Sequence, residues 1–377
     1  MNIRIFFDPV PEALAELENH PNSFLQNSDV HSETFPLWPE ADIAIIGIND
    51  SRGSYEGSGE TGAADAVRVA LYSLKRVNPR LKVADLGNLR PGINLEESHL
   101  RLSEVCSALK TANTIPVIIG GTHDFTLGQI AGFDRDYRVH PAIIDSVADM
   151  EDNSISLHSR NFMAEIFGNA GRKLSAFTLL GYQSYLIDRE YIDWMDRQYF
   201  NTMRLGELRG NMAEAEPWLR DADLLSVDLA ALKRQDVPGS LQSKAFGLLG
   251  EEACLLCRYA GLGHKMSSFG LYGYSPSADI AGQTAFVAAT MIWYFCEGFS
   301  ERMPEPDPVS PDTEIYSLPI SGGPDIMVFL HNTLSGQWYI QLDGGPNSRM
   351  LPCSYRDYLM VKEGDLPDRF VNAIARN

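Results

Sequence analysis

The chain has 377 residues and a hydrophobic content of 44%, enough for a large core that needs no disulfide or metal to hold it together. It carries 50 acidic and 31 basic residues, a formal net charge of -19, and no basic run that could follow a phosphate backbone. We therefore expect no nucleic acid partner and no attachment to anionic membranes. The sequence begins without an apolar signal-peptide core, and no apolar run is long enough to span a membrane, so we expect a cytoplasmic protein.

Five cysteines are scattered through segments that have helix or strand patterns. Their odd number and their scatter are typical of free thiols in a reducing compartment. Cys254 and Cys257 form a CxxC, but no second CxxC and no histidine at zinc-finger spacing accompanies them. We interpret this pair as two small apolar residues on a buried helix face.

Strand-like and helix-like segments alternate along most of the chain, after an irregular arm over residues 1–40. Short apolar runs predict strands at 41–47, 82–87, 117–121, 142–145, 176–182, 222–228 and 266–272. Amphipathic patterns predict helices at 62–76, 94–112, 161–167, 251–261 and 283–299. This alternation predicts a three-layer α/β/α domain over residues 41–300, with a mostly parallel sheet of roughly eight strands.

The composition changes at residues 301–313 (ERMPEPDPVSPDT), a proline-rich acidic stretch that is typical of an extended linker. Beyond it, two apolar runs separated by the turn residues 334–336 predict a pair of strands, and the end of the chain has a helical pattern. We expect residues 314–377 to form a small α+β appendage docked on the main domain.

Polar side chains follow three of the predicted strands. His123 comes after the strand VIIGG, Asp145 and Asp149 after AII, and Asp228 ends ADLLSVD. The carboxyl ends of parallel strands meet at one edge of a sheet, where ligands and catalytic groups collect. We therefore expect these four side chains to share a site.

The segments GGTHD (120–124), DSVAD (145–149) and SVDLA (226–230) resemble the three metal-binding signatures of the ureohydrolase family, which are usually GGDHS, DAHxD and SxDxD. That family includes arginase, agmatinase and formimidoylglutamase, and the third segment is most similar to the formimidoylglutamase version. The resemblance implies an arginase-like fold and hydrolysis of a linear C–N bond in a small guanidino or formimino compound. It also allows a homo-oligomer.

The resemblance implies a partial metal site. The family holds two Mn²⁺ ions with six residues, and four of them correspond to identical residues here: His123, Asp145, Asp149 and Asp228. Val147 stands in place of a family histidine and Ala230 in place of an aspartate, and both lost positions serve the second metal alone. We predict a single divalent ion, with Mn²⁺ as the expected metal.

A cluster of three carboxylates needs a positive partner whatever the chain's activity. Two such charges 4 Å apart repel by about 4 kcal/mol at an effective dielectric constant of 20, so an empty cluster must take up protons or a cation. One ion acidifies water less than two, and the expected activity is weak or altered hydrolysis. The alternative is a catalytically inactive member of the family that acts as a binding or regulatory module.

Each candidate residue also has a structural interpretation. His123 could satisfy a buried backbone group, and Asp145 and Asp149 could cap loops or helices. The resemblance places His158, in SLHSRNF, at a proton-shuttling histidine, with an ordinary loop histidine as the alternative.

The resemblance also places Glu252, in GLLGEEAC, at the glutamate that orients the cationic group of the substrate. Glu251 would take that role if the register were shifted by one residue. Either carboxylate could instead be a first-turn residue favoured by the helix dipole.

Overall fold

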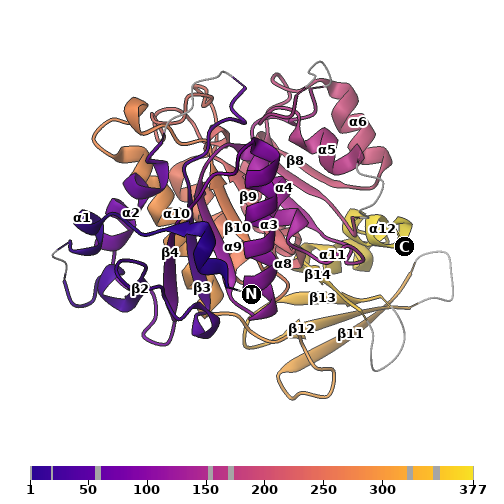
Figure 1. Ribbon diagram of the computed structural model, residues 1–377. Helices are drawn as coiled ribbons and strands as arrows, with labels where there is room; N and C mark the ends of the chain where they lie inside the picture. Colours follow the sequence, from indigo (N-terminus) through magenta and orange to yellow (C-terminus); the bar gives the residue numbers. More distant parts are fainter. Residues whose placement is uncertain are drawn as a thin grey trace.

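The computed structural model describes residues 2–17, 20–55, 61–151, 156–168, 174–320, 326–342 and 349–376. Within these ranges the chain forms a large, mostly parallel sheet covered by helices, with a small antiparallel sheet beside it (Figure 1). The predicted three-layer α/β/α architecture is confirmed.

Ten strands of the described chain form the large sheet. They are β1 (Phe7–Asp8), β2 (Ser28–Val30), β3 (Ile43–Ile48), β4 (Val83–Leu89), β5 (Ile115–Gly120), β6 (Pro141–Ile144), β7 (Thr178–Tyr182), β8 (Asn201–Arg204), β9 (Leu224–Asp228) and β10 (Phe269–Tyr272). Their order is β1-β4-β3-β5-β10-β9-β6-β7-β8, with β2 also paired to β4, and only β1 runs antiparallel to its neighbour. The strands β5, β10, β9 and β6 therefore lie side by side in the middle of the sheet.

The sheet has more strands than the roughly eight expected, because three short ones escaped prediction. β1 and β2 lie in the arm that the sequence suggested to be irregular, and both pair with β4. β8 pairs with β7 at the far edge of the sheet. Strands of two or three residues, such as β1 and β2, give too few positions to form a pattern, and β8 has the largely polar sequence NTMR in place of an apolar run.

Helices cover both faces of the sheet, since successive residues of its strands point to opposite sides. In β3, Ile43 and Ile45 pack into one core, and Ala44, Ile46 and Ile48 into another. The first core includes residues of α2 (Ala63–Ser73), α7 (Leu205–Gly210), α8 (Glu216–Asp221), α9 (Gly250–Gly261) and α10 (Gln283–Ser300). On the other face lie α3 (Leu95–Thr111), α4 (Thr126–Ala131), α5 (Phe162–Gly168) and α6 (Arg189–Arg197), while α1 (Glu12–Ala15) belongs to the arm.

The C-terminal part of the chain forms a sheet of its own after a stretch, 301–312, that has neither helix nor strand. Its strands, in the order β11-β12-β13-β14, are β11 (Thr313–Pro319), β12 (Ile326–Asn332), β13 (Trp338–Gln341) and β14 (Met350–Cys353), followed by α11 (Tyr355–Glu363) and α12 (Asp368–Ala375). Arg220 of α8 docks this unit, because its Nη2 donates to the carbonyl oxygens of Trp338 and Cys353 at 3.2 and 3.4 Å.

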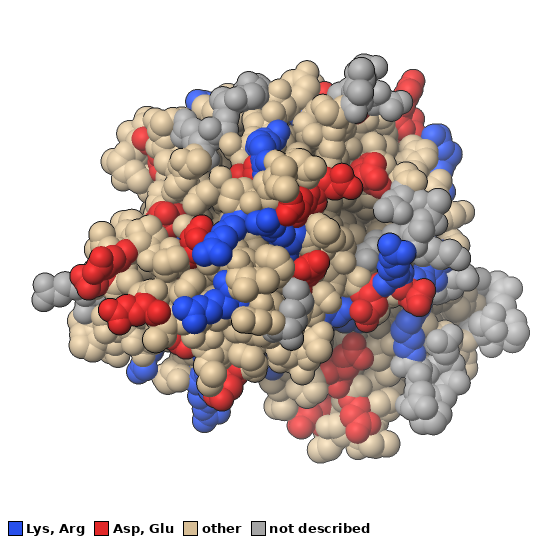
Figure 2. Space-filling model, in the orientation of Figure 1, with Lys and Arg blue, Asp and Glu red and all other residues tan. Residues whose placement is uncertain are grey.

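The five cysteines are buried free thiols, and Cys254 and Cys257 both lie inside α9. Among the helices of the described residues, none is both long and apolar enough to cross a membrane. On the face shown in Figure 2, lysine and arginine side chains lie interspersed with aspartate and glutamate side chains.

Candidate metal centre

Four predicted site residues meet at the carboxyl ends of the central strands. His123 begins the short 3-10 helix that follows β5, Asp145 follows β6, and Asp228 is the last residue of β9. The His123 Nδ1 atom lies 3.0 Å from Asp145 Oδ2, 3.4 Å from Asp149 Oδ2 and 3.5 Å from Asp228 Oδ2. One ligand atom each from His123, Asp145 and Asp228 lies within 4.8 Å of the others, which is the spacing of a metal site.

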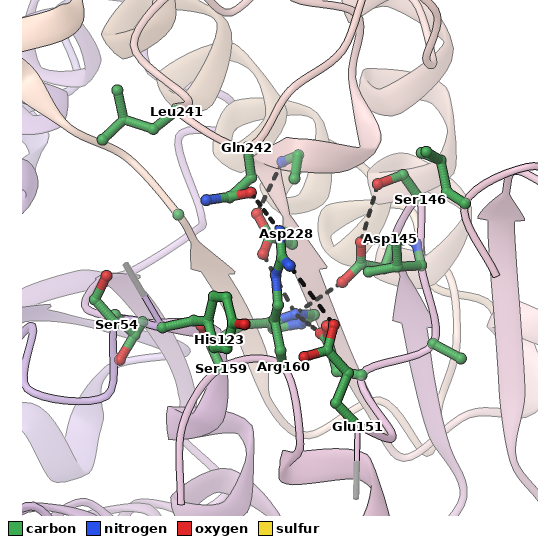
Figure 3. Close-up of a pocket in the computed structure, with 18 of the residues that line it drawn as sticks. Ser54, His123, Asp145, Ser146, Glu151, Ser159, Arg160, Asp228, Leu241 and Gln242 are labelled. Atoms are coloured by element: carbon green, nitrogen blue, oxygen red, sulfur yellow. Dashed lines mark hydrogen bonds and ion pairs between the residues drawn. The ribbon is translucent and has the colours of Figure 1, made fainter. Parts of the chain in front are cut away.

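The cluster lies at the bottom of a cavity of about 500 Å³. The exposed fraction of the His123 side chain is 0%, and that of Asp228, the most exposed of the four, is 14%. Ser54, Ser146, Glu151, Ser159, Arg160 and Gln242 are among the residues that form the walls (Figure 3). A buried cluster that still opens into a cavity can be reached by an ion and by a small substrate.

A chain of hydroxyl groups fixes the orientation of the His123 ring. Thr126 Oγ1 donates to the His123 carbonyl oxygen at 2.7 Å, so it must accept the hydrogen bond that joins it to Ser226 Oγ at 2.6 Å. The only proton of the Ser226 hydroxyl is then donated to Thr126 Oγ1, so Ser226 Oγ must accept a hydrogen bond from His123 Nε2, 3.0 Å away. The proton of the neutral ring is therefore on Nε2, and the lone pair of Nδ1 faces the carboxylates.

Two atoms in the centre of the cluster have no hydrogen-bond partner among the described residues. They are His123 Nδ1 and Asp145 Oδ2, both fully buried and 3.0 Å apart in a direction that makes no hydrogen bond. An unpaired buried polar atom is costly unless an ion or water satisfies it. One imidazole nitrogen and three carboxylates suit Mn²⁺ and similar divalent ions, so the residues present fit such an ion.

Burial and mutual repulsion change the pKa values of the cluster. Burial raises the pKa of Asp228 to about 6, with the Asp145 charge adding to the rise, and burial raises the pKa of Asp149 as well. Burial alone would lower the pKa of His123, but the close approach of Asp145 and Asp149 raises it to about 10. The cluster therefore holds protons that a divalent ion would displace.

The second oxygens of Asp145 and Asp228 are bound to backbone groups. Asp145 Oδ1 accepts from the Val147 N–H at 3.2 Å, and Asp228 Oδ1 accepts from the Ala230 N–H at 2.8 Å. Asp145 thus fulfils the loop-capping interpretation through Oδ1, Asp228 caps a backbone N–H in the same way although the sequence did not suggest it, and both face His123 through Oδ2. Val147 and Ala230 line the same cavity but bring no ligand atom to it.

Comparison with known proteins identifies the family of the chain. A model of the arginase family matches residues 41–297, more than half of the sequence. The chain belongs to the arginase family. The matched residues include the whole of the buried cluster at the strand ends.

Formimidoylglutamases are among the family members that this arginase-family chain is similar to. The enzyme of Corynebacterium efficiens is 25% identical over 307 residues, which is 74% of this chain and 95% of the relative. That of Rhodococcus jostii is 25% identical over 284 residues, 70% of this chain and 88% of the relative.

Among solved structures, a Trypanosoma cruzi formiminoglutamase variant crystallised with Mn²⁺ aligns with a TM-score of 0.63 at 25% identity, covering 70% of this chain and 95% of that one. The formimidoylglutamase of Bacillus subtilis has the same fold, with a TM-score of 0.65 at 16% identity and coverage of 77% and 92%. The chain is a formimidoylglutamase-like member of the arginase family.

His158 lies beside the cavity wall. Its exposed fraction is 8%, its Nδ1 accepts from the Arg160 backbone N–H at 3.1 Å, and its ring centroid is 5.0 Å from that of Tyr55. Tyr55, Ser159 and Arg160 line the cavity, whereas His158 itself does not. The predicted proton shuttle therefore lies next to residues that line the cavity but does not itself line it.

The structure does not bring Glu252 into the cavity. Its two carboxylate oxygens accept from Arg209 Nε and Nη2 at 2.8 and 2.9 Å, and one of them also accepts from the Leu249 N–H at 2.8 Å. These bonds make Glu252 a capping residue in the first turn of α9, which is the structural interpretation of this position. Glu251 is exposed and does not line the cavity either.

Sequence reasoning gave no account of Asp124 and did not assign a role to Ser226. Asp124 is turned toward α3, where its Oδ2 lies 2.7 Å from His99 Nε2, and it is fully buried. Ser226 could have been found, since it lies two positions before Asp228 on β9 and side chains two apart share one face of a strand. The pairing of Asp124 with His99 left no comparable signal in the sequence.

Proposed function

We propose that this arginase-family protein hydrolyses a linear C–N bond of a small formimino or guanidino compound at a single divalent metal, with Mn²⁺ as the expected ion. His123, Asp145, Asp149 and Asp228 would hold it. The observation that carries the proposal is the position of His123 Nδ1. This atom is buried, makes no hydrogen bond with the described residues, and lies 3.0 to 3.5 Å from one oxygen of each of the three carboxylates. The formimidoylglutamase relatives support the choice of reaction and substrate class.

When bound, a divalent ion in such a site lowers the pKa of water and polarises the carbon that is attacked. The chain itself supplies the rest of the site. Ser226 and Thr126 hold the Nε2 proton of His123 in place, so the proton that an ion would displace from the ring is the one on Nδ1. His158 does not line the cavity, and its Nδ1 already accepts a backbone N–H, so a proton-transfer role for it would need its Nε2 to reach the cavity past Tyr55 and Arg160.

The expected activity is weak, because the carboxylate that would orient a cationic substrate group is engaged elsewhere. Glu252 is bound by Arg209 through two short hydrogen bonds and lies outside the cavity wall. This observation also favours the second candidate function, a family member without catalysis that binds a small molecule or a partner.

Product assays on metal-loaded protein separate these two candidates. The protein would be loaded with Mn²⁺ and incubated with arginine, agmatine or formimidoylglutamate, and the release of urea or formamide would be followed. We expect slow release from one of them, and its loss in Asp228→Asn, which keeps the size of the side chain but removes a ligand charge. Bound Mn²⁺ without product from any of the three would instead favour the non-catalytic function.

A further inference from the structure

Arg160 is held in the cavity by three contacts. Its Nη2 donates to Gln242 Oε1 at 2.8 Å, its Nη1 lies 3.5 Å from Glu151 Oε1, and its Cζ lies 4.6 Å from the centroid of the Tyr55 ring. Figure 3 shows the side chain running from the segment of Ser159 toward Gln242, among the residues that surround the cluster. These contacts come from three separate segments, and together they fix where the guanidinium charge lies.

The charges of the cluster do not balance with one divalent ion. Asp145, Asp149 and Asp228 carry three negative charges when ionised, and a single divalent ion leaves one of them uncompensated in a buried place. Apart from His123, the described residues that line the cavity include two cationic side chains, Arg160 and Lys244. An arginine keeps its charge at every accessible pH, so its contribution is permanent.

Of these two cations, Arg160 is the one that acts on the cluster. Its guanidinium is fixed by Gln242 and Tyr55 in the cavity that Asp228 also lines, and its side chain is 33% exposed, whereas Lys244 is exposed to solvent. Glu151 offsets part of the Arg160 charge, but its side chain is 46% exposed and the contact is long, so water screens that pair.

We propose that the Arg160 guanidinium is the second positive charge of this metal centre: it balances the carboxylate cluster beside one divalent ion and disfavours entry of a second ion. The inference rests on the proposed function, because it takes the cluster to be a metal site. The side chains of Val147 and Ala230 line the same space and offer no ligand that could compensate the repulsion between the guanidinium and another cation.

Binding of Mn²⁺ to charge variants tests this role with a readout that does not depend on activity. Removing the charge in Arg160→Gln should lower the Kd for Mn²⁺ about ten-fold or more, because a repulsive charge near the ion is lost. Arg160→Lys keeps the charge and should stay within about three-fold of the natural protein. Lys244→Gln is the matched control, since it removes an exposed cation from the same cavity, and it should change the Kd by less than about two-fold.

The same variants can be combined with restored ligands. In Val147→His with Ala230→Asp, a second Mn²⁺ should bind at least about ten-fold more tightly once Arg160→Gln is added. Calorimetric titration gives both Kd and stoichiometry, and thermal melting of each metal-free variant confirms that it is folded.

If the Kd of Arg160→Gln for Mn²⁺ is unchanged or higher, with one Mn²⁺ still bound, this inference is overturned and the proposed function stands. If Val147→His with Ala230→Asp binds the second Mn²⁺ equally tightly with and without Arg160→Gln, this inference is likewise overturned and the proposed function stands. Absence of Mn²⁺ binding in every variant would overturn both.

Discussion

Ser226 is the residue through which the orientation of His123 can be tested most directly. Its hydroxyl is fully buried and accepts from His123 Nε2 at 3.0 Å. Ser226→Ala leaves the Nε2–H without an acceptor, which costs about 1 to 3 kcal/mol of unfolding free energy. The ring is then free to carry its proton on Nδ1, the atom that faces the carboxylates, and loss of such a supporting partner typically weakens metal affinity about 10- to 100-fold.

The assay is a calorimetric titration of Mn²⁺ into the metal-free variant, with urea unfolding of the same sample. Ser268→Ala is the matched control, because Ser268 Oγ is buried and accepts from Gln129 Nε2 at 2.9 Å but does not line the cavity. The control should lose similar stability and keep the natural Kd for Mn²⁺. A Ser226→Ala variant with lowered stability and an unchanged Kd would refute the hydroxyl relay that fixes the histidine.

Three further predictions concern the neighbours and the protons of the cluster. Gly273→Ala should raise the Kd for Mn²⁺ at least about ten-fold. The new Cβ would lie 2.3 Å from Asp228 Oδ1, and the backbone φ of +80° at this position favours glycine. An unchanged Kd by titration would contradict the placement of the Asp228 carboxylate. Glu252→Gln should lower the unfolding free energy by about 1 kcal/mol, because it weakens the helix cap and the pair with Arg209. The KM for substrate should stay unchanged, and a raised KM would instead support the substrate-orienting role. In metal-free protein, urea unfolding should show stability falling as the pH rises from about 4 to about 6 and again from 6.5 to about 10, since the folded-state pKa values of Asp228 and His123 lie above their unfolded values. Saturating Mn²⁺ should reverse this trend because it displaces those protons, and parallel pH profiles with and without Mn²⁺ would show that the ion binds elsewhere.

Sequence patterns predicted the parts of the fold that depend on local chemistry. Buried parallel strands such as β5 and β6 are continuous apolar runs. The polar residues His123 and Asp145 follow the ends of these two strands, so the sequence shows where they lie. Short edge strands such as β1 carry too few residues to form a pattern and exist only because β4 is there to pair with them.

Contacts between distant segments could not be predicted in this way. Glu252 was expected to face a substrate, and what directs it elsewhere is Arg209, 43 residues earlier in the chain. Arg160 is likewise placed by Tyr55, Glu151 and Gln242, of which two lie far from it in the sequence. The partners of a side chain on a loop are set by tertiary packing, and local sequence patterns do not predict them.

The central claim is a metal centre that holds one divalent ion, and the number of ions bound tests it most directly. The chelated natural protein would be dialysed against Mn²⁺ and its metal content determined by elemental analysis alongside its protein concentration. We predict close to one equivalent, held by His123 and the three carboxylates. Less than about a tenth of an equivalent would contradict the metal centre itself, and a value near two would show that Val147 and Ala230 do not mark a lost site.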